Sequence, residues 1–237
     1  DMNFSVAASL GFHERLVDIA VEKILEMNNG NAASSELGAL NGLTGAPNVQ
    51  HPIEKESFDI IGRELGDAGF SALELPIVKR VIHASADFDF KETLRFSAGA
   101  IEAGIEAIRK GCNIITDVKM VEAGITRAAT GGFGNKLFCF SSDQDVARTA
   151  EKENITKTAA SMRHTAHLMD GGIVAVGNAP TALVELIRLI KNKGARPALV
   201  VGIPVGFVGA IEAKQELING GVPYITNIGR KGGSTVA

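Results

Sequence analysis

Short runs of β-branched and other apolar residues alternate with longer helical stretches through most of the chain. The runs are predicted strands, and they cover residues 113–116, 136–140, 173–176, 198–201 and 224–227. The predicted helices cover residues 52–68, 76–85, 97–110, 118–124, 143–152, 156–169, 180–193 and 207–219. Continuously apolar strands separated by helices are typical of a parallel sheet covered on both faces. The sequence therefore predicts a three-layer α/β/α domain with a mainly parallel, doubly wound sheet of about five strands.

The segment from residue 1 to residue 50 differs from the rest of the chain in charge and in pattern. It holds six acidic and two basic side chains, whereas the whole chain of 237 residues has a net charge of −3. Apolar residues recur at helical spacing over 11–28, which predicts an acidic amphipathic helix. Residues 28–50 are small and polar without a period, as in a linker. We therefore predict an acidic helix and linker over 1–50 and one α/β domain over 51–237.

The composition excludes several classes of protein. Hydrophobic residues make up 45% of the chain, enough to fill a sizeable core, and no charge-free stretch is suited to span a membrane. The net charge of −3 argues against a broad basic surface for nucleic acid. Cys112 and Cys139 lie in apolar runs, so we expect them in the core rather than in a disulfide or a metal site. No secretory signal is visible, and we expect a cytoplasmic protein.

Glycine and small polar residues follow each predicted strand, at the edge where ligands bind in a parallel α/β sheet. These segments are residues 117–120, 141–143, 177–181, 202–206 and 229–234. Neither the glycine pattern of dinucleotide sites nor that of nucleoside triphosphate sites occurs. Gly202, Gly206 and Gly209 are explained either by close packing of a helix start on a strand end or by close approach of the backbone to a large ligand.

The histidines offer one candidate for catalysis. His164 and His167 are three residues apart on one predicted helix, but without a metal-binding pattern they are expected to be structural. His83 lies between Arg80 and Asp87 among small side chains. A lone histidine on a helix is more often structural than catalytic, and the local pattern does not decide between the two.

Six blocks, in order along the chain, resemble the precorrin-8X methylmutases, also called precorrin isomerases, and the cobalt-precorrin-8 methylmutases. The resemblance runs from about residue 51 to residue 234. The blocks are IEKESFDII (53–61), VIHA (81–84), TDVKMVEAGITR (116–127), VGNAPTAL (176–183), GIPVGFVGA (202–210) and GRKGGS (229–234).

The resemblance implies a homodimeric, flavodoxin-like isomerase of cobalamin biosynthesis that needs no cofactor and no protein-bound metal. Such an enzyme moves a methyl group from C-11 to C-12 of a tetrapyrrole macrocycle, with or without cobalt at its centre. His83 matches the histidine taken as the proton donor, and imidazole titrates near neutrality as this role requires. The residues that match substrate-binding positions are Ser57, Asp117, Thr126, Arg127, Lys157, Asn178 and Arg230.

The chain departs from the family pattern at several places. Lys157 stands where the family usually has arginine. The lysine offers a compact point charge in place of the bidentate contact that an arginine makes. Ala213 stands where serine is frequent, and relatives often continue beyond the position of Ala237. Two other functions stay open from the residues alone. One is a nucleotide or phosphosugar enzyme on a similar sheet, and the other is a non-catalytic flavodoxin-like module in which His83 is structural.

Overall fold

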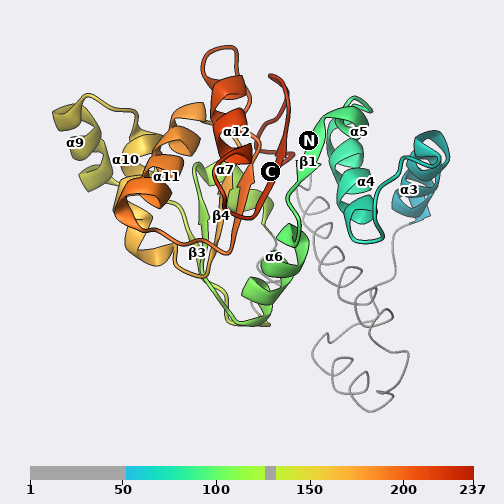
Figure 1. The fold of residues 1–237 in the computed structure, drawn as a ribbon, viewed down its shortest axis with the longest axis horizontal. Coiled ribbons are helices and arrows are strands. Elements are labelled where there is room, and N and C mark those ends of the chain that lie inside the picture. The colour runs from blue at the N-terminus through green and yellow to red at the C-terminus, as the bar shows by residue number, and fades with distance from the viewer. Residues whose placement is uncertain (1–51, 126–131) are drawn as a thin grey trace, which may run out of the picture. The chain divides into compact units, whose positions relative to one another are not determined.

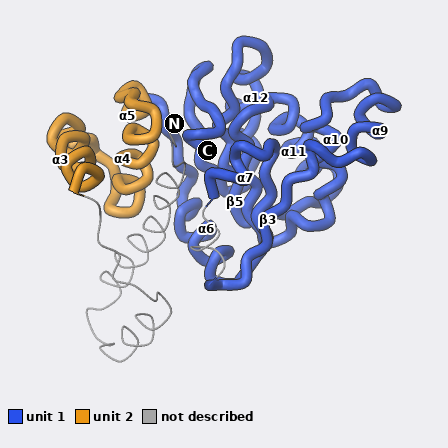
Figure 2. Tube along the Cα trace, turned by 180° about the vertical axis from the view of Figure 1, so that it is seen from behind, with its two compact units in different colours: residues 1–13, 92–237 blue, residues 14–91 orange. Residues whose placement is uncertain are grey.

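The computed structural model describes residues 52–125 and 132–237, which fall into two compact units (Figures 1 and 2). We call residues 52–91 the helical unit, and residues 92–125 together with 132–237 the α/β unit. The acidic helix and linker expected over 1–50 lie outside the described residues. The domain boundary at residue 50 therefore stays a prediction.

The helical unit contains α3 (Pro52–Leu65) and α4 (Glu74–Ser85), both predicted from the sequence. A reciprocal capping box starts α4, because the Ser71 backbone N–H donates to the Glu74 carboxylate at 2.8 Å and the Glu74 N–H donates to the Ser71 hydroxyl at 3.2 Å. The helix ends at Ser85, and the capping residue Ala86 that follows has a left-handed conformation with φ of 52°. The buried apolar side chains of the two helices are Ile61, Leu65, Val78, Val81 and Ile82.

A six-stranded sheet forms the centre of the α/β unit. Its strands are β1 (Leu94–Phe96), β2 (Ile114–Thr116), β3 (Leu137–Phe138), β4 (Ile173–Val176), β5 (Leu199–Gly202) and β6 (Tyr224–Asn227). All five predicted strands are confirmed. The sequence did not predict β1, which pairs antiparallel with β6, or the short helix α5 (Phe90–Thr93) before it.

The strand order is β1-β6-β5-β4-β2-β3, and every pair except β1–β6 is parallel. The five parallel strands thus have the doubly wound order of flavodoxin-like proteins, and the strand order reverses between β2 and β4. The helices are α6 (Ala100–Arg109), α7 (Lys119–Gly124), α9 (Gln144–Glu153), α10 (Lys157–Thr165), the 3₁₀ turn η2 (Ala166–Leu168), α11 (Pro180–Lys193) and α12 (Ala210–Ile218). The predicted helix 156–169 is therefore split into α10 and η2.

Neighbouring residues of β5 show that helices cover both faces of the sheet. Val200 belongs to the main core with Leu183 of α11 and Leu217 of α12. Leu199 lies against Gly104 of α6, so closely that a β-carbon at Gly104 would be 2.7 Å from the Leu199 side chain. Successive side chains of a strand point to opposite faces, so α6 covers one face and α11 and α12 cover the other. The predicted three-layer α/β/α fold is confirmed.

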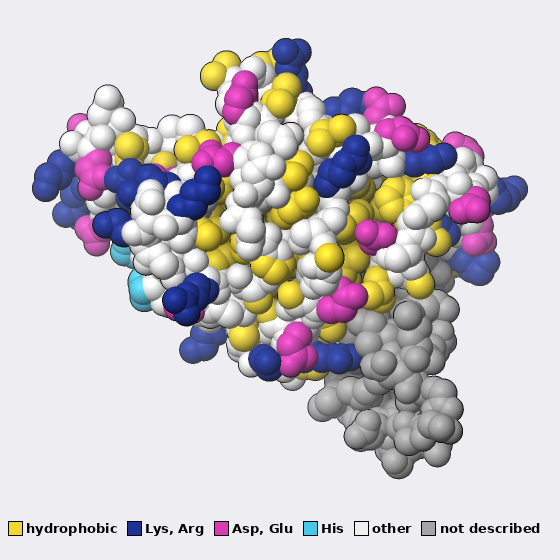
Figure 3. Space-filling model, in the orientation of Figure 1, with side chains coloured by type: hydrophobic (Ala, Val, Ile, Leu, Met, Phe, Trp, Pro, Cys, Tyr) yellow, Lys and Arg dark blue, Asp and Glu magenta, His cyan; other side chains and the backbone are white. Residues whose placement is uncertain are grey.

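The face of the described residues shown in Figure 3 is mixed in charge. Basic and acidic side chains are interspersed over the face shown in Figure 3, with hydrophobic side chains between them. Among the described residues, no helix has the length and apolar character that crossing a membrane requires.

Candidate active site

The carboxylate of Asp117 joins β2 to β4, where the strand order reverses. It follows β2, is fully buried, and accepts hydrogen bonds from three backbone N–H groups of the turn after β4. The donors are Gly177 at 3.1 Å, Asn178 at 2.8 Å and Ala179 at 2.9 Å. Hydrogen bonds to an ionised acceptor are stronger than neutral ones, so Asp117 sets the position of this turn and of α11, which starts at Pro180.

Three threonine hydroxyls lie together where α10 and α11 begin. Thr156 is the N-cap of α10, and its Oγ1 accepts from the Ala159 N–H at 3.2 Å. The same oxygen lies 2.8 Å from Oγ1 of Thr181, the second residue of α11, and 3.2 Å from Oγ1 of Thr158. Lys157, the first residue of α10, is exposed beside them. This edge therefore offers hydroxyl groups and one cation to an acidic ligand.

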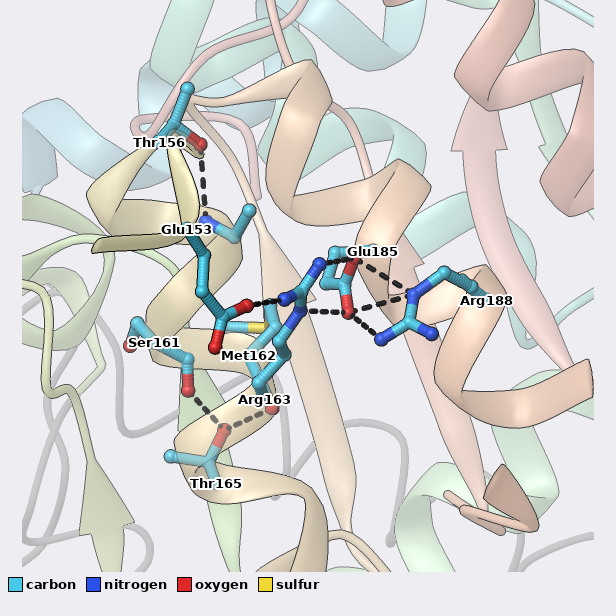
Figure 4. A network of polar contacts seen from close by, with 9 residues as sticks. Glu153, Thr156, Ser161, Met162, Arg163, Thr165, Glu185 and Arg188 are labelled. Carbon is cyan, nitrogen blue, oxygen red and sulfur yellow. Dashed lines mark hydrogen bonds and ion pairs between the residues drawn. The ribbon is translucent and has the colours of Figure 1, made fainter. Parts of the chain in front are cut away.

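A network of charged side chains holds α9, α10 and α11 together (Figure 4). Arg163 of α10 pairs with Glu153 of α9 and, at 2.6 Å, with Glu185 of α11. Arg188 pairs with the same Glu185 at 2.5 Å. The two guanidinium groups hold the pKa of Glu185 below its usual range, although burial opposes them as the largest single effect. The network therefore ties the last turn of α10 to the end of α9 and to α11.

The loops after β5 and β6 meet beside an exposed aromatic ring. The Gly206 N–H donates to the Arg230 carbonyl at 3.2 Å, and the Arg230 guanidinium carbon lies 5.5 Å from the centre of the Phe207 ring. Phe207 is 85% exposed and its neighbour Val208 is 88% exposed. An aromatic ring with a cation over its face suits a flat ligand that carries carboxylates.

Lys214 of α12 binds the loop after β6 through hydrogen bonds to its backbone. Its side chain is 1% exposed and donates to the backbone carbonyls of Gly229 at 3.1 Å and Lys231 at 2.6 Å. Burial lowers its pKa to about 8. The sequence reasoning missed this residue. The sequence does contain a signal for it. Lys214 is four residues after Ala210 and three before Leu217, a spacing that puts it on the apolar face of α12.

In the helical unit, His83 of α4 stacks on Phe58 of α3. The ring centres are 4.8 Å apart and the ring planes are inclined by 14°. The imidazole is half-buried, and burial together with the charge of Arg80 lowers its pKa below 6.5, against an opposing effect of Glu54. The hydroxyl of Ser57, next to Phe58, donates to the Ile53 carbonyl at 2.9 Å.

The predicted site residues are distributed over both units. Ser57 and His83 lie in the helical unit. Asp117, Lys157, Asn178 and Arg230 lie in the α/β unit, on segments that follow strands or begin helices. Thr126 and Arg127 lie outside the described residues. His164 and His167 are exposed, and no cluster of metal-binding side chains occurs in 52–125 and 132–237.

One family profile spans both units. The profile described as precorrin-8X methylmutase matches residues 52–237. This chain belongs to the precorrin-8X methylmutase family. Members of the family are methylmutases, which are isomerases, so family membership identifies the chain as an isomerase and supports the resemblance found in the six sequence blocks.

Relatives under both family names match most of their own length. A cobalt-precorrin-8 methylmutase of Priestia megaterium is 51% identical over 184 residues, which cover 78% of this chain and 82% of the relative. A precorrin-8X methylmutase of Pseudomonas aeruginosa is 39% identical over 187 residues, with coverages of 78% and 89%. A solved precorrin-8X methylmutase structure from Thermus thermophilus has a TM-score of 0.72 at 46% identity, and the match covers 78% of this chain and 89% of that one.

Proposed function

We propose that this protein is a precorrin-8X or cobalt-precorrin-8 methylmutase that moves a methyl group from C-11 to C-12 of the macrocycle, with His83 as general acid. His83 is the histidine of the VIHA block, and the observation that carries its role is its partly exposed imidazole, which stacks on Phe58. The migration rearranges conjugated double bonds and needs a proton delivered to the macrocycle. The imidazolium gives that proton, and the neutral imidazole takes it back at the end of the shift.

The lowered pKa of His83 has two consequences for this chemistry. It makes the imidazolium a stronger acid, which favours proton transfer to a weakly basic conjugated system. It also leaves less of the imidazolium at neutral pH in the free enzyme. A substrate with several carboxylates counteracts this loss, because negative charge near an imidazole raises its pKa.

The polar groups at the loops of the α/β unit bind the carboxylate side chains of the substrate. Lys157 and Arg230 are exposed cations, and Asn178 and Thr156 offer an amide and a hydroxyl. Ser57, Thr126 and Arg127 complete the set by their match to family positions. Asp117 serves as a positioning residue, because its buried carboxylate already accepts three backbone N–H groups.

The same proposal covers assembly and location. The enzyme works as a homodimer in the cytoplasm, as the resemblance to biosynthetic methylmutases implies. Mass measurement by light scattering on the purified full-length chain tests the dimer. A monomer with full activity would contradict it.

Turnover of both substrate forms tests the function. The purified chain is mixed with precorrin-8 or cobalt-precorrin-8, and the visible spectrum and the product mass are followed in a single turnover. We expect a spectral change at unchanged mass and a loss of about 10²–10⁴-fold in rate for His83→Ala. Hydrogenobyrinic acid should still bind this variant. A wild-type chain that neither converts nor binds either tetrapyrrole would support the nucleotide enzyme or the non-catalytic module instead.

A further inference from the structure

The imidazole of His83 and the guanidinium of Arg80 both lie against the ring of Phe58. The Phe58 ring centre is 4.8 Å from the imidazole centre and 4.7 Å from the guanidinium carbon. His83 and Arg80 are three residues apart on α4, whereas Phe58 belongs to α3. A ring stacked at this distance restricts rotation of the imidazole, and a cation over an aromatic ring is attracted to it.

Glu54 of α3 completes the arrangement through an ion pair with Arg80. The nitrogen and oxygen are 3.2 Å apart, and each side chain is 14% exposed. The Lys55–Asp59 pair on the same helix is different, because its side chains are 67% and 58% exposed. Solvent and salt therefore screen the Glu54–Arg80 pair far less than the Lys55–Asp59 pair.

The Arg80 guanidinium is held in this place despite an unsatisfied donor. Its Nε is buried and has no hydrogen-bond partner among the described residues. Leaving a buried donor of a charged group unpaired costs free energy. The pair with Glu54 and the contact with Phe58 offset that cost, so the cation is kept against the ring on which the imidazole also stacks.

We propose that Phe58, Arg80 and Glu54 are positioning residues for His83. The Phe58 ring holds the plane of the imidazole, and the Arg80–Glu54 ion pair sets the charge near it. The inference rests on the proposed role of His83 as general acid. The two charged groups act on the imidazole in opposite directions, since Arg80 of α4 lowers its pKa and Glu54 of α3 raises it. A proton donor needs both a fixed direction of transfer and a controlled proton affinity.

Titration of His83 in the full-length protein tests the role of the charges without an activity assay. The imidazole signal is followed by NMR as a function of pH, and His83→Ala assigns it among the five histidines. We expect Arg80→Gln to raise the pKa of His83 and Glu54→Gln to lower it. Asp59→Asn, which breaks the exposed pair on the same helix, should leave it unchanged. Shifts of equal sign in the two test variants, or no shift in either, would overturn the inference.

Single-turnover kinetics test the role of the ring. We expect Phe58→Leu to slow methyl transfer about ten- to a hundredfold with nearly unchanged affinity for hydrogenobyrinic acid, because the imidazole loses its fixed plane. Phe58→Tyr keeps a ring and should keep the rate near that of wild type. If His83→Ala is inactive and Phe58→Leu reacts at the wild-type rate, the positioning role of Phe58 is wrong and the proposed function stands. If His83→Ala reacts normally, the general acid itself is wrong.

Discussion

The half-buried imidazole of His83 predicts the pH dependence of the reaction. Burial and Arg80 place its folded-state pKa below 6.5, and the ratio kcat/KM reports the ionisation of the free enzyme. If the imidazolium is the required form, kcat/KM falls as pH rises through a midpoint below 6.5. A profile measured from pH 5 to pH 8 checks this. A value of kcat/KM that rises over the same range would assign His83 to a basic role.

The variant Asp117→Asn tests whether Asp117 positions the backbone or contacts the substrate. In the wild type, the two carboxylate oxygens of Asp117 accept hydrogen bonds from three backbone N–H groups. In Asp117→Asn one of these oxygens becomes an NH₂ group, which cannot accept and faces a backbone donor instead. We expect the free energy of unfolding to fall by about 2–4 kcal/mol, measured by urea denaturation.

The helix cap Asp143 provides the comparison for Asp117. Its side chain accepts from the backbone of Asp145 and Val146, so Asp143→Ala should cost only about 1 kcal/mol. Unchanged stability of Asp117→Asn together with weaker binding of hydrogenobyrinic acid would show instead that Asp117 contacts the substrate.

At the scale of the elements, the salt dependence of ligand binding tests the function of the segment where α10 and α11 begin. If Lys157 contacts a substrate carboxylate, Lys157→Ala weakens binding of hydrogenobyrinic acid more at low salt than at high salt, because part of the lost attraction is screened. Lys157→Arg should retain or tighten binding. Thr156→Val is the control for loss of the neighbouring hydroxyl. Equal affinity of wild type and Lys157→Ala at all salt concentrations would mean that Lys157 only faces solvent.

The contact between α12 and the loop after β6 predicts a pH-dependent stability. The pKa of Lys214 is about 8 in the folded protein against 10.5 as its ordinary value, so between these values the unfolded chain binds more protons. Stability attributable to this group therefore rises with pH through that window, by on the order of 3 kcal/mol in total.

Unfolding free energies at pH 7 to pH 10 test this by comparing wild type with Lys214→Met. The variant has no titrating group at this position, so we expect the wild type to gain stability relative to it as pH rises. A constant difference between the two proteins would show that Lys214 keeps an ordinary proton affinity in the folded state.

For the whole molecule, the boundary predicted at residue 50 can be tested by truncation. A chain that starts at His51 retains every sequence block of the family, and the family profile begins at residue 52. We expect it to fold, to bind hydrogenobyrinic acid and to turn over substrate at a rate close to that of the full chain. Failure to fold or to bind would show that residues 1–50 belong to the core of the domain.

The five parallel strands could be predicted because each is a short run rich in β-branched and other apolar residues between helical stretches, as in a sheet covered by helices on both faces. The strand β1 could not, because the charged Arg95 interrupts its short apolar run. It is a strand through its pairing with β6, where Leu94 lies opposite Asn227, and that pairing joins residues distant in the sequence.

The sequence by itself determined the fold class, the family and the identity of the candidate residues, because apolar periodicity and motif blocks are local properties of the chain. Only the tertiary structure decided what those residues touch. The carboxylate of Asp117 faces three backbone donors about sixty positions away, and His83 lies on the ring of Phe58. Lys214 is buried under a loop fifteen residues ahead. Burial, stacking and hydrogen bonding depend on the distance between groups in space, which spacing along the chain does not contain.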